Sequence, residues 1–390
     1  MITALVQAIT VMTANAMVVI APAMGDLLDV DPAMIGFQVS FVYAGAMIAV
    51  ILGGRLVQRF GACRTQQLCL MLAAVGALGA TVPSLWVLAL ASFVMGLGTG
   101  PATPASSHAL NRFTDPGKRN LIFSIKQTGV PLGVVWAAFM MPSMTLAVGP
   151  AWSFVTVAAI GLTVLVVLQP ARRAWDDDRT PGLPLITEPL AGLRLVWRQP
   201  VLRWLSLSAY FYSFCQLCVT SFTVTMLVKE MGLGLVKAGA LLSVVLLSGV
   251  FARIVLGIYA DRLGSALRPL ALIGTATAVM CGVTALLDPG WPRSALYLLL
   301  VLLGGSAVGW TGMFVAEVAR VAPRGQVGLA TSGAIAFNFL GILSGPALFA
   351  IVYQWIGSYS HTFGLLAFVA LTGVALILKT RSIERRLAAA

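Results

Sequence analysis

The sequence predicts an all-α membrane protein with twelve transmembrane helices in two pseudo-symmetric six-helix bundles. Of the 390 residues, 59% are hydrophobic and 10% are charged, and the mean hydropathy is +0.94. Soluble domains carry about a quarter charged residues, so this composition excludes an ordinary soluble domain. Apolar runs of bilayer-spanning length recur along the chain, and the same short motif follows one such run in each half.

The spans are predicted in order from the apolar runs, because a transmembrane helix needs about 20 mostly apolar residues. Such runs begin near residues 3, 34, 65, 86, 120, 150, 201, 236, 268, 294, 326 and 361. The first lacks a basic leader and a cleavage site, so we expect a retained span. The longest polar connection is 170–200. We therefore expect an N-terminal bundle over 1–169, a central loop over 170–200, and a C-terminal bundle with a short tail over 201–390.

The basic residues predict the orientation in the membrane. Of 25 Lys and Arg residues, 20 lie in alternate loops and the C-terminal tail, two lie inside spans, and three lie in the other loops (Lys229, Lys237 and Arg293). The positive-inside rule places the central loop and both termini in the cytoplasm. The net charge of +12 is thus spread over loops that meet membrane lipid, which argues against nucleic acid. No Asn-x-Ser/Thr acceptor occurs, as expected for a bacterial inner membrane.

The repeated motif, Gly-x-x-x-x-Arg-x-Gly, follows the second and the eighth predicted spans. Its first copy has Gly54, Gln58, Arg59 and Gly61, and its second has Gly257, Asp261, Arg262 and Gly264. The fifth and eleventh spans also align, with Gly129 and Gly133 in one and Gly341 and Gly345 in the other. This small-xxx-small spacing predicts close approach of a neighbouring helix. The fourth and tenth spans align at Gly100 and Gly309.

On the basis of this repeated loop, the chain resembles members of the major facilitator superfamily over essentially its full length. The family pattern is Gly-x-Leu-Ala-Asp-Arg-x-Gly-Arg. The second copy matches it well, whereas Gln58 occupies the acidic position in the first. The resemblance implies alternating access by two rocking bundles, a site near the midplane, no cofactor and a monomer. It also implies conformational-switch loops, of which we expect the one with Asp261 to be the stronger.

Two cations lie inside predicted spans, where a charge is costly and usually marks a site. Lys126 and Arg253 each lie on the order of 10 Å inside the membrane boundary, at about 1.5 Å per residue. No acidic residue occupies the deep part of any span, so an anion could bind there. The alternative is that each side chain snorkels to the interface.

Arg253 adds a narrower resemblance. The stretch Ala252-Arg253-Ile254-Val255-Leu256-Gly257 is similar to the eighth helix of the monocarboxylate and oxalate transporter branch, in which an arginine binds the substrate carboxylate. Proton-coupled members have an aspartate one turn earlier. That position is Gly249 here, so the resemblance does not carry over their proton-coupling scheme.

Other polar residues of the spans divide into two groups. Glu317 and His108 are candidate proton carriers, although Glu317 could instead pair with Arg320 one turn later. The second group is expected to line a pocket with Lys126 and Arg253, or else to bind neighbouring helices. It consists of Asn15, Tyr43, Tyr210, Gln216, Trp310 and Asn338.

Together these features favour a secondary transporter, proton-coupled symport included, for a small organic anion such as a carboxylate. Efflux of hydrophobic drugs or other small molecules is the alternative within transport, and a non-transporting receptor on the same fold is a second one. An intramembrane enzyme is not expected, because the two histidines are far apart and neither Gly-x-Ser-x-Gly nor His-Glu-x-x-His occurs. No metal site is predicted.

Overall fold

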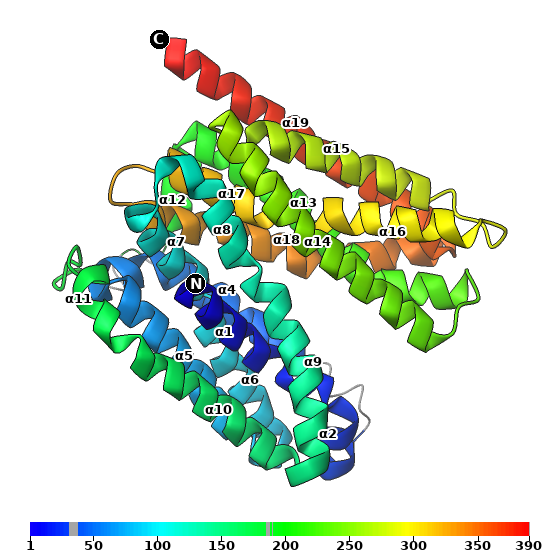
Figure 1. Ribbon diagram of the computed structural model, residues 1–390, viewed down its shortest axis with the longest axis horizontal. Helices are drawn as coiled ribbons and strands as arrows, with labels where there is room; N and C mark the ends of the chain where they lie inside the picture. The colour runs from blue at the N-terminus through cyan, green and yellow to red at the C-terminus, as the bar shows by residue number, and fades with distance from the viewer. Residues whose placement is uncertain (31–37, 185–187, 189, 390) are drawn as a thin grey trace. The chain divides into compact units, whose positions relative to one another are not determined.

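The structure, a computed structural model, describes residues 1–30, 38–184, 188 and 190–389. All of the regular secondary structure in these residues is helical (Figure 1). The longer helices of the first half are α1 (Ile2–Val19), α4 (Gln38–Phe60), α5 (Ala62–Gly79), α6 (Leu85–Thr99), α7 (Ala102–Phe113), α8 (Arg119–Gln127), α9 (Gly129–Val148) and α10 (Pro150–Val167). Those of the second half are α13 (Pro200–Lys229), α14 (Leu235–Leu263), α15 (Leu267–Thr284), α16 (Arg293–Val308), α17 (Thr311–Val321), α18 (Val327–Ile356) and α19 (Tyr359–Ala389). The short helices are α2 (Ala21–Leu28), α11 (Arg172–Trp175) and α12 (Ala191–Arg198).

A helix occupies each of the twelve predicted positions, but eleven stretches in the described residues are long and apolar enough to cross a membrane. The exception is α5, whose first turns carry Arg64, Gln66 and Gln67. The multi-pass, all-α architecture is confirmed.

The described chain divides into two compact units. Unit 1 comprises Met1–Phe113, Lys126–Leu195 and Ala322–Ala336. Unit 2 comprises Thr114–Ile125, Val196–Val321 and Phe337–Ala390. Each unit thus contains one short segment from the opposite half of the sequence. These two segments are the stretch that precedes Lys126, and the connection before α18 together with the first residues of that helix.

Close helix packing in unit 1 depends on the glycines of α9. A Cβ atom on Gly129 would lie 2.4 Å from the carbonyl oxygen of Ala4, and one on Gly133 would lie 2.3 Å from that of Ala8. Both carbonyls belong to α1. The missing side chains therefore let α9 and α1 approach to backbone contact, as the spacing predicts.

The equivalent contact in unit 2 joins α18 to α13. A Cβ atom on Gly341 would lie 2.2 Å from the carbonyl oxygen of Tyr210, and one on Gly345 would lie 3.1 Å from that of Phe214. The internal repeat thus extends to the way the two glycine-bearing helices pack.

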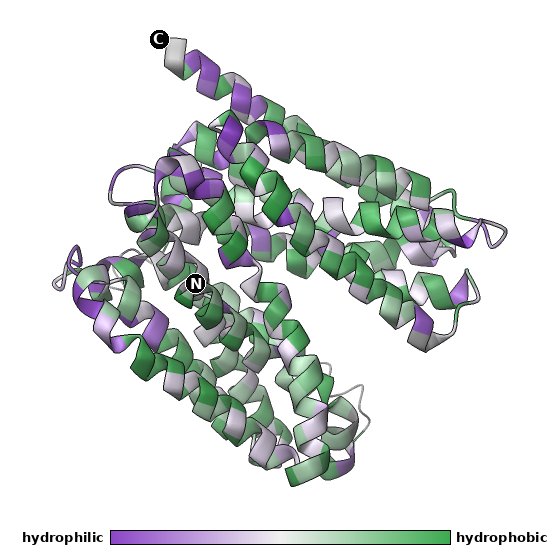
Figure 2. Ribbon diagram, viewed as in Figure 1, coloured by the Kyte–Doolittle hydropathy of each residue, from purple (hydrophilic) through white to green (hydrophobic). Residues whose placement is uncertain are grey.

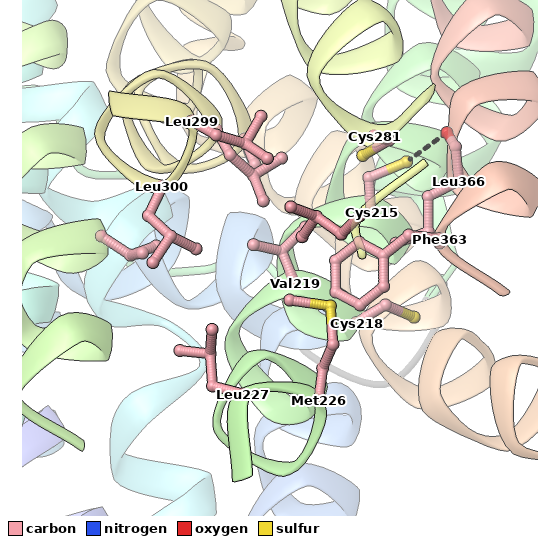
Figure 3. Close-up of a cluster of buried hydrophobic side chains, with 14 of the residues drawn as sticks. Cys215, Cys218, Val219, Met226, Leu227, Cys281, Leu299, Leu300, Phe363 and Leu366 are labelled. Atoms are coloured by element: carbon pink, nitrogen blue, oxygen red, sulfur yellow. Dashed lines mark hydrogen bonds between the residues drawn. The ribbon is translucent and has the colours of Figure 1, made fainter. Parts of the chain in front are cut away.

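The core of unit 2 contains three free, buried cysteines. Figure 3 shows Cys215, Cys218 and Cys281 among apolar side chains that include Phe363 and Leu366. The thiol of Cys215 donates to the Leu366 carbonyl at 3.5 Å. These cysteines therefore serve as small apolar residues of the core. Figure 2 shows that most of the helices are predominantly hydrophobic.

Two helices are interrupted at corresponding positions of the repeat. The fourth span breaks at Gly100, between α6 and α7, and the tenth breaks at Gly309, between α16 and α17. In transporters with internal repeats, matched interruptions of this kind commonly mark the substrate pathway, because they free backbone groups inside the membrane. The fifth span is also interrupted, at Thr128, two residues after Lys126.

Candidate functional site

Arg253 lies on α14 in unit 2 and is buried, with 2% of its surface exposed. Its Nε donates a hydrogen bond to the carbonyl oxygen of Val308 at 3.0 Å. Val308 is the last residue of α16, and a helix end leaves its final carbonyls without partners in the helix. The guanidinium is thus bound to the negative end of a broken helix. It does not extend along a lipid-exposed surface.

Gly249, one turn before Arg253, explains why no acidic residue accompanies the arginine there. A Cβ atom on Gly249 would lie 2.6 Å from Cβ of Val308. A carboxylate at this position would therefore require α14 and α16 to move apart. Because α14 and α16 pack closely enough for Val308 to reach Arg253, an aspartate does not fit at position 249.

Trp310 and Gln216, both predicted to line a pocket, bind one another instead. Trp310 Nε1 donates to Gln216 Oε1 at 2.9 Å, and the indole packs edge-on against Tyr212 at 5.6 Å between ring centroids. Tyr212 in turn donates to the carbonyl oxygen of Leu270. The gap beside these rings has a volume of only about 10 Å³, enough for one water molecule. This cluster stabilises the break at Gly309.

Tyr210 and Asn338 complete the predicted residues of the pocket in unit 2. The hydroxyl of Tyr210 accepts a hydrogen bond from Ser344 Oγ of α18 at 3.0 Å. Asn338 is half-buried on the same helix. Tyr210 therefore joins α13 to α18 close to the Gly341 contact.

Lys126 is the buried cation of unit 1, with 2% of its surface exposed. Its Nζ donates to Gln127 Oε1 at 2.8 Å and to Thr103 Oγ1 at 3.4 Å, and Thr103 donates to Gln7 Oε1 at 3.2 Å. These partners are neutral, and no described acid forms an ion pair with Lys126. Lys126 and Arg253 belong to different units.

The remaining predicted residues of unit 1 are Asn15 and Tyr43. Asn15 donates to the carbonyl oxygen of Val11 in its own helix at 2.8 Å, and Tyr43 is half-buried on α4. The amide of Asn15 thus has a local structural role.

The second-half signature loop binds the start of α8 through Asp261. One carboxylate oxygen accepts from the backbone and side-chain amides of Asn120, at 2.8 and 2.9 Å, and the other accepts from the Leu121 amide at 2.9 Å. A negative charge at a helix N-terminus satisfies free N–H groups and complements the helix dipole. Gly257 allows the approach, since a Cβ atom there would lie 2.8 Å from Ser124 Oγ. Gly264 ends α14 with φ +67°, and Arg262 is exposed.

The first-half loop is organised differently. The Gln58 carbonyl accepts from the Thr180 amide at 2.7 Å, while its side-chain oxygen is buried without a partner among the described residues. Gly54 contacts the part of α18 that belongs to unit 1. A Cβ atom on Gly54 would lie 2.5 Å from Cα of Leu329. Arg59 lies over the ring of Phe60. No carboxylate on the loop itself binds a helix start.

Asp176, from the central connection, supplies the carboxylate that caps α5. It accepts from the Cys63 amide at 2.7 Å and the Arg64 amide at 3.3 Å. Gly61 has φ +91°, and a Cβ atom there would lie 2.2 Å from Asp176 Oδ1. Burial raises the pKa of Asp176, although the two amides lower it in part.

Asp177 and Asp178 also attach the central connection to α7, and the sequence analysis did not predict these contacts. Asp178 binds His108 Nε2 at 2.7 Å and Arg112 at 3.0 Å, and Asp177 binds Arg112 at 2.7 Å. The hydrogen bond from Arg112 holds the pKa of Asp177 below its ordinary value. Three consecutive aspartates among basic residues were the available signal.

Glu317 is fully buried in unit 2, and both its oxygens are engaged. Oε1 accepts from Ser265 Oγ at 3.0 Å and from Arg320 at 2.6 Å, and Oε2 accepts from the Ala266 amide at 2.9 Å. Arg320 also binds Glu384. Glu317 thus caps the start of α15 and pairs with Arg320. His108 belongs to the other unit.

A family model described as Major Facilitator Superfamily matches residues 3–319. An uncharacterized MFS-type transporter of Mycobacterium tuberculosis is 26% identical over 76% of this chain, and the match spans 64% of that relative's length. A gentisate transporter of Corynebacterium glutamicum is 26% identical over 92% of this chain and 83% of its own.

Solved structures agree with the fold. FucP in its outward conformation has a TM-score of 0.79 at 16% identity, covering 97% of this chain and 98% of its own. The human organic anion transporter MFSD10 has a TM-score of 0.76 at 18% identity, covering 96% and 98%. At such low identity, these structures establish the fold alone.

Proposed function

Because the chain belongs to the major facilitator superfamily, we propose that it is a membrane transporter, not an enzyme, and that it carries a small organic anion, a carboxylate. Arg253 carries this proposal, because its buried guanidinium lies within a membrane-spanning helix and binds the end of the broken helix α16. Charged side chains at such depth are costly to bury and usually serve transport. The gentisate transporter among the relatives supports the class of substrate.

The geometry of Arg253 suits a carboxylate. A guanidinium has five N–H donors in a planar fork, and the Nε of Arg253 donates to Val308. A carboxylate binds such a fork through two parallel hydrogen bonds. In the proposed mechanism, a bound anion on Arg253 is held beside the end of α16, where Gly309 interrupts the helix. Lys126 is the buried cation of unit 1, and we propose that it contributes to anion transport separately within that unit.

Proton coupling is not part of this proposal. Both oxygens of Glu317 already serve α15 and Arg320, and His108 binds Asp178. We place the termini and residues 170–200 in the cytoplasm of a bacterial cell from the asymmetry of basic residues.

The test begins with a thermal-shift screen of purified protein against organic acids, gentisate included, followed by calorimetry with the best ligand. Arg253→Lys should lower affinity roughly 30-fold or more, because lysine offers a point charge in place of the fork. Lys126→Ala should cause a smaller loss. Arg324→Lys, the same change at an exposed loop residue, is the control and should bind normally.

Affinity of folded Arg253→Lys within about threefold of the parent would contradict the proposal. A screen in which hydrophobic cations bind and carboxylates do not would favour drug efflux. Ligand binding without exchange of labelled ligand in proteoliposomes would instead identify a receptor.

A further inference from the structure

The C-terminal end of α19 carries a cluster of arginines that the proposed transport site does not use. Arg381, Arg385 and Arg386 line an open groove of about 420 Å³ together with Leu378 and Ser382. Arg268, at the start of α15, and Arg385 lie close enough to Arg381 for their charges to repel it. No described acid forms an ion pair with any of these four arginines. The groove therefore concentrates positive charge.

The acid nearest in sequence, Glu384, is directed elsewhere. It binds Arg320 of α17 and does not line the groove. Lys379 is also turned away, with its Nζ 3.6 Å from the ring centroid of Trp204. The arginine side of the helix is thus left without a countercharge from the described part of the protein.

An exposed apolar stripe on α19 leads directly into this cluster. Phe368, Leu371, Ala375 and Leu378 are exposed and follow one another at helical spacing, and the same face continues through Ser382 to Arg385. At about 1.5 Å per residue the stripe is roughly 15 Å long, which equals one leaflet of a hydrocarbon core about 30 Å thick. Figure 2 shows the hydrophobic part of α19 giving way to a hydrophilic C-terminal end.

We propose that an anionic phospholipid binds this face of α19, with its phosphate on Arg381 and Arg385 and its acyl chains along Phe368 to Leu378. Planar guanidinium groups suit phosphate oxygens, which accept paired hydrogen bonds. The apolar stripe distinguishes a lipid from a free phosphate ion, which has no use for it.

Native mass spectrometry of the detergent-purified protein tests this with dioleoyl phosphatidylglycerol. Arg381→Gln/Arg385→Gln should weaken binding roughly 30-fold, at about 1 kcal/mol for each arginine near a lipid headgroup. The control is Lys118→Gln/Arg324→Gln, which removes two exposed loop charges and should bind like the parent. The single variant Arg385→Gln, at an exposed position, gives an intermediate loss if the double variant does not fold.

Three outcomes would overturn the proposal. One is equal binding by the parent and the Arg381→Gln/Arg385→Gln protein. Another is an equal loss in the control. The third is displacement of the lipid by inorganic phosphate, or equal affinity for dihexanoyl and dioleoyl phosphatidylglycerol, since either would show an anion site without an acyl component.

Discussion

Single carboxylates hold the starts of four α-helices in the described part of the chain. Asp261 binds the first amides of α8, Asp176 those of α5, Glu317 that of α15, and Glu230 those of Tyr359 and Ser360 at the start of α19. Helix starts leave N–H groups without partners, and lipid offers none. Burial raises the pKa of Glu230, but its hydrogen bonds, chiefly from Ser360, lower it by more. Each carboxylate comes from another part of the sequence, so spacing alone could not pair it with its helix.

Asp261→Asn should impair transport far more than Gln58→Ala. The substitution removes the charge and one of the two acceptor oxygens that bind Asn120 and Leu121, whereas Gln58 contributes through its backbone carbonyl. Loss of a helix cap typically costs about 0.5–2 kcal/mol, so thermal unfolding should also shift for Asp261→Asn. Uptake by proteoliposomes, compared at equal protein, measures the first effect. Equal losses in the two variants would mean that the loops are equivalent.

For the helices, sequence patterns predicted which ones pack closely better than they predicted where a helix is interrupted. The glycine spacing in the fifth and eleventh spans correctly predicted close contacts, and the structure adds that the partners are α1 and α13. The alignment of Gly100 with Gly309 gave no indication that both helices break, because hydropathy continues across each break. The pairing of Gln216 with Trp310 was equally hidden, since it joins α13 to the tenth span.

Gly341→Ala should destabilise unit 2 by about 1–3 kcal/mol, as expected when a methyl group is forced into a packed contact. The new Cβ atom would meet the Tyr210 carbonyl oxygen at 2.2 Å. Gly282→Ala is the matched control, because nothing lies within 4 Å of a Cβ atom at this position in α15. Alanine should stabilise that helix by a few tenths to about 1 kcal/mol. Thermal unfolding in detergent compares them, and a lower midpoint for both would point to a general intolerance of substitution.

For the whole molecule, composition and the repeated motif were enough to predict the family and the membrane-spanning helices. Two short segments, Thr114–Ile125 and Ala322–Ala336, cluster with the opposite half of the sequence. Their attachment depends on contacts such as Asn120 with Asp261, 141 residues apart, which no local pattern encodes.

The orientation follows from the uneven distribution of basic residues and can be measured by cysteine labelling. Gly182→Cys, in the central connection, and Gly290→Cys, between α15 and α16, should react with impermeant maleimide from opposite sides of the membrane. The parent protein is the control, because its five cysteines are buried and should not react. Reaction of both variants from one side would contradict the predicted topology.

The two segments that cluster with the opposite half of the sequence, Thr114–Ile125 and Ala322–Ala336, also constrain the order of folding as the chain emerges from the ribosome. Asp176 emerges soon after α10 and can cap α5 while the second half is still unmade. Thr114–Ile125, by contrast, must wait for Asp261, and unit 1 remains unfinished until residues 322–336 have been synthesised. Domains usually fold in sequence as they emerge. Here the first half waits for the second, so the two reach their final packing late and together.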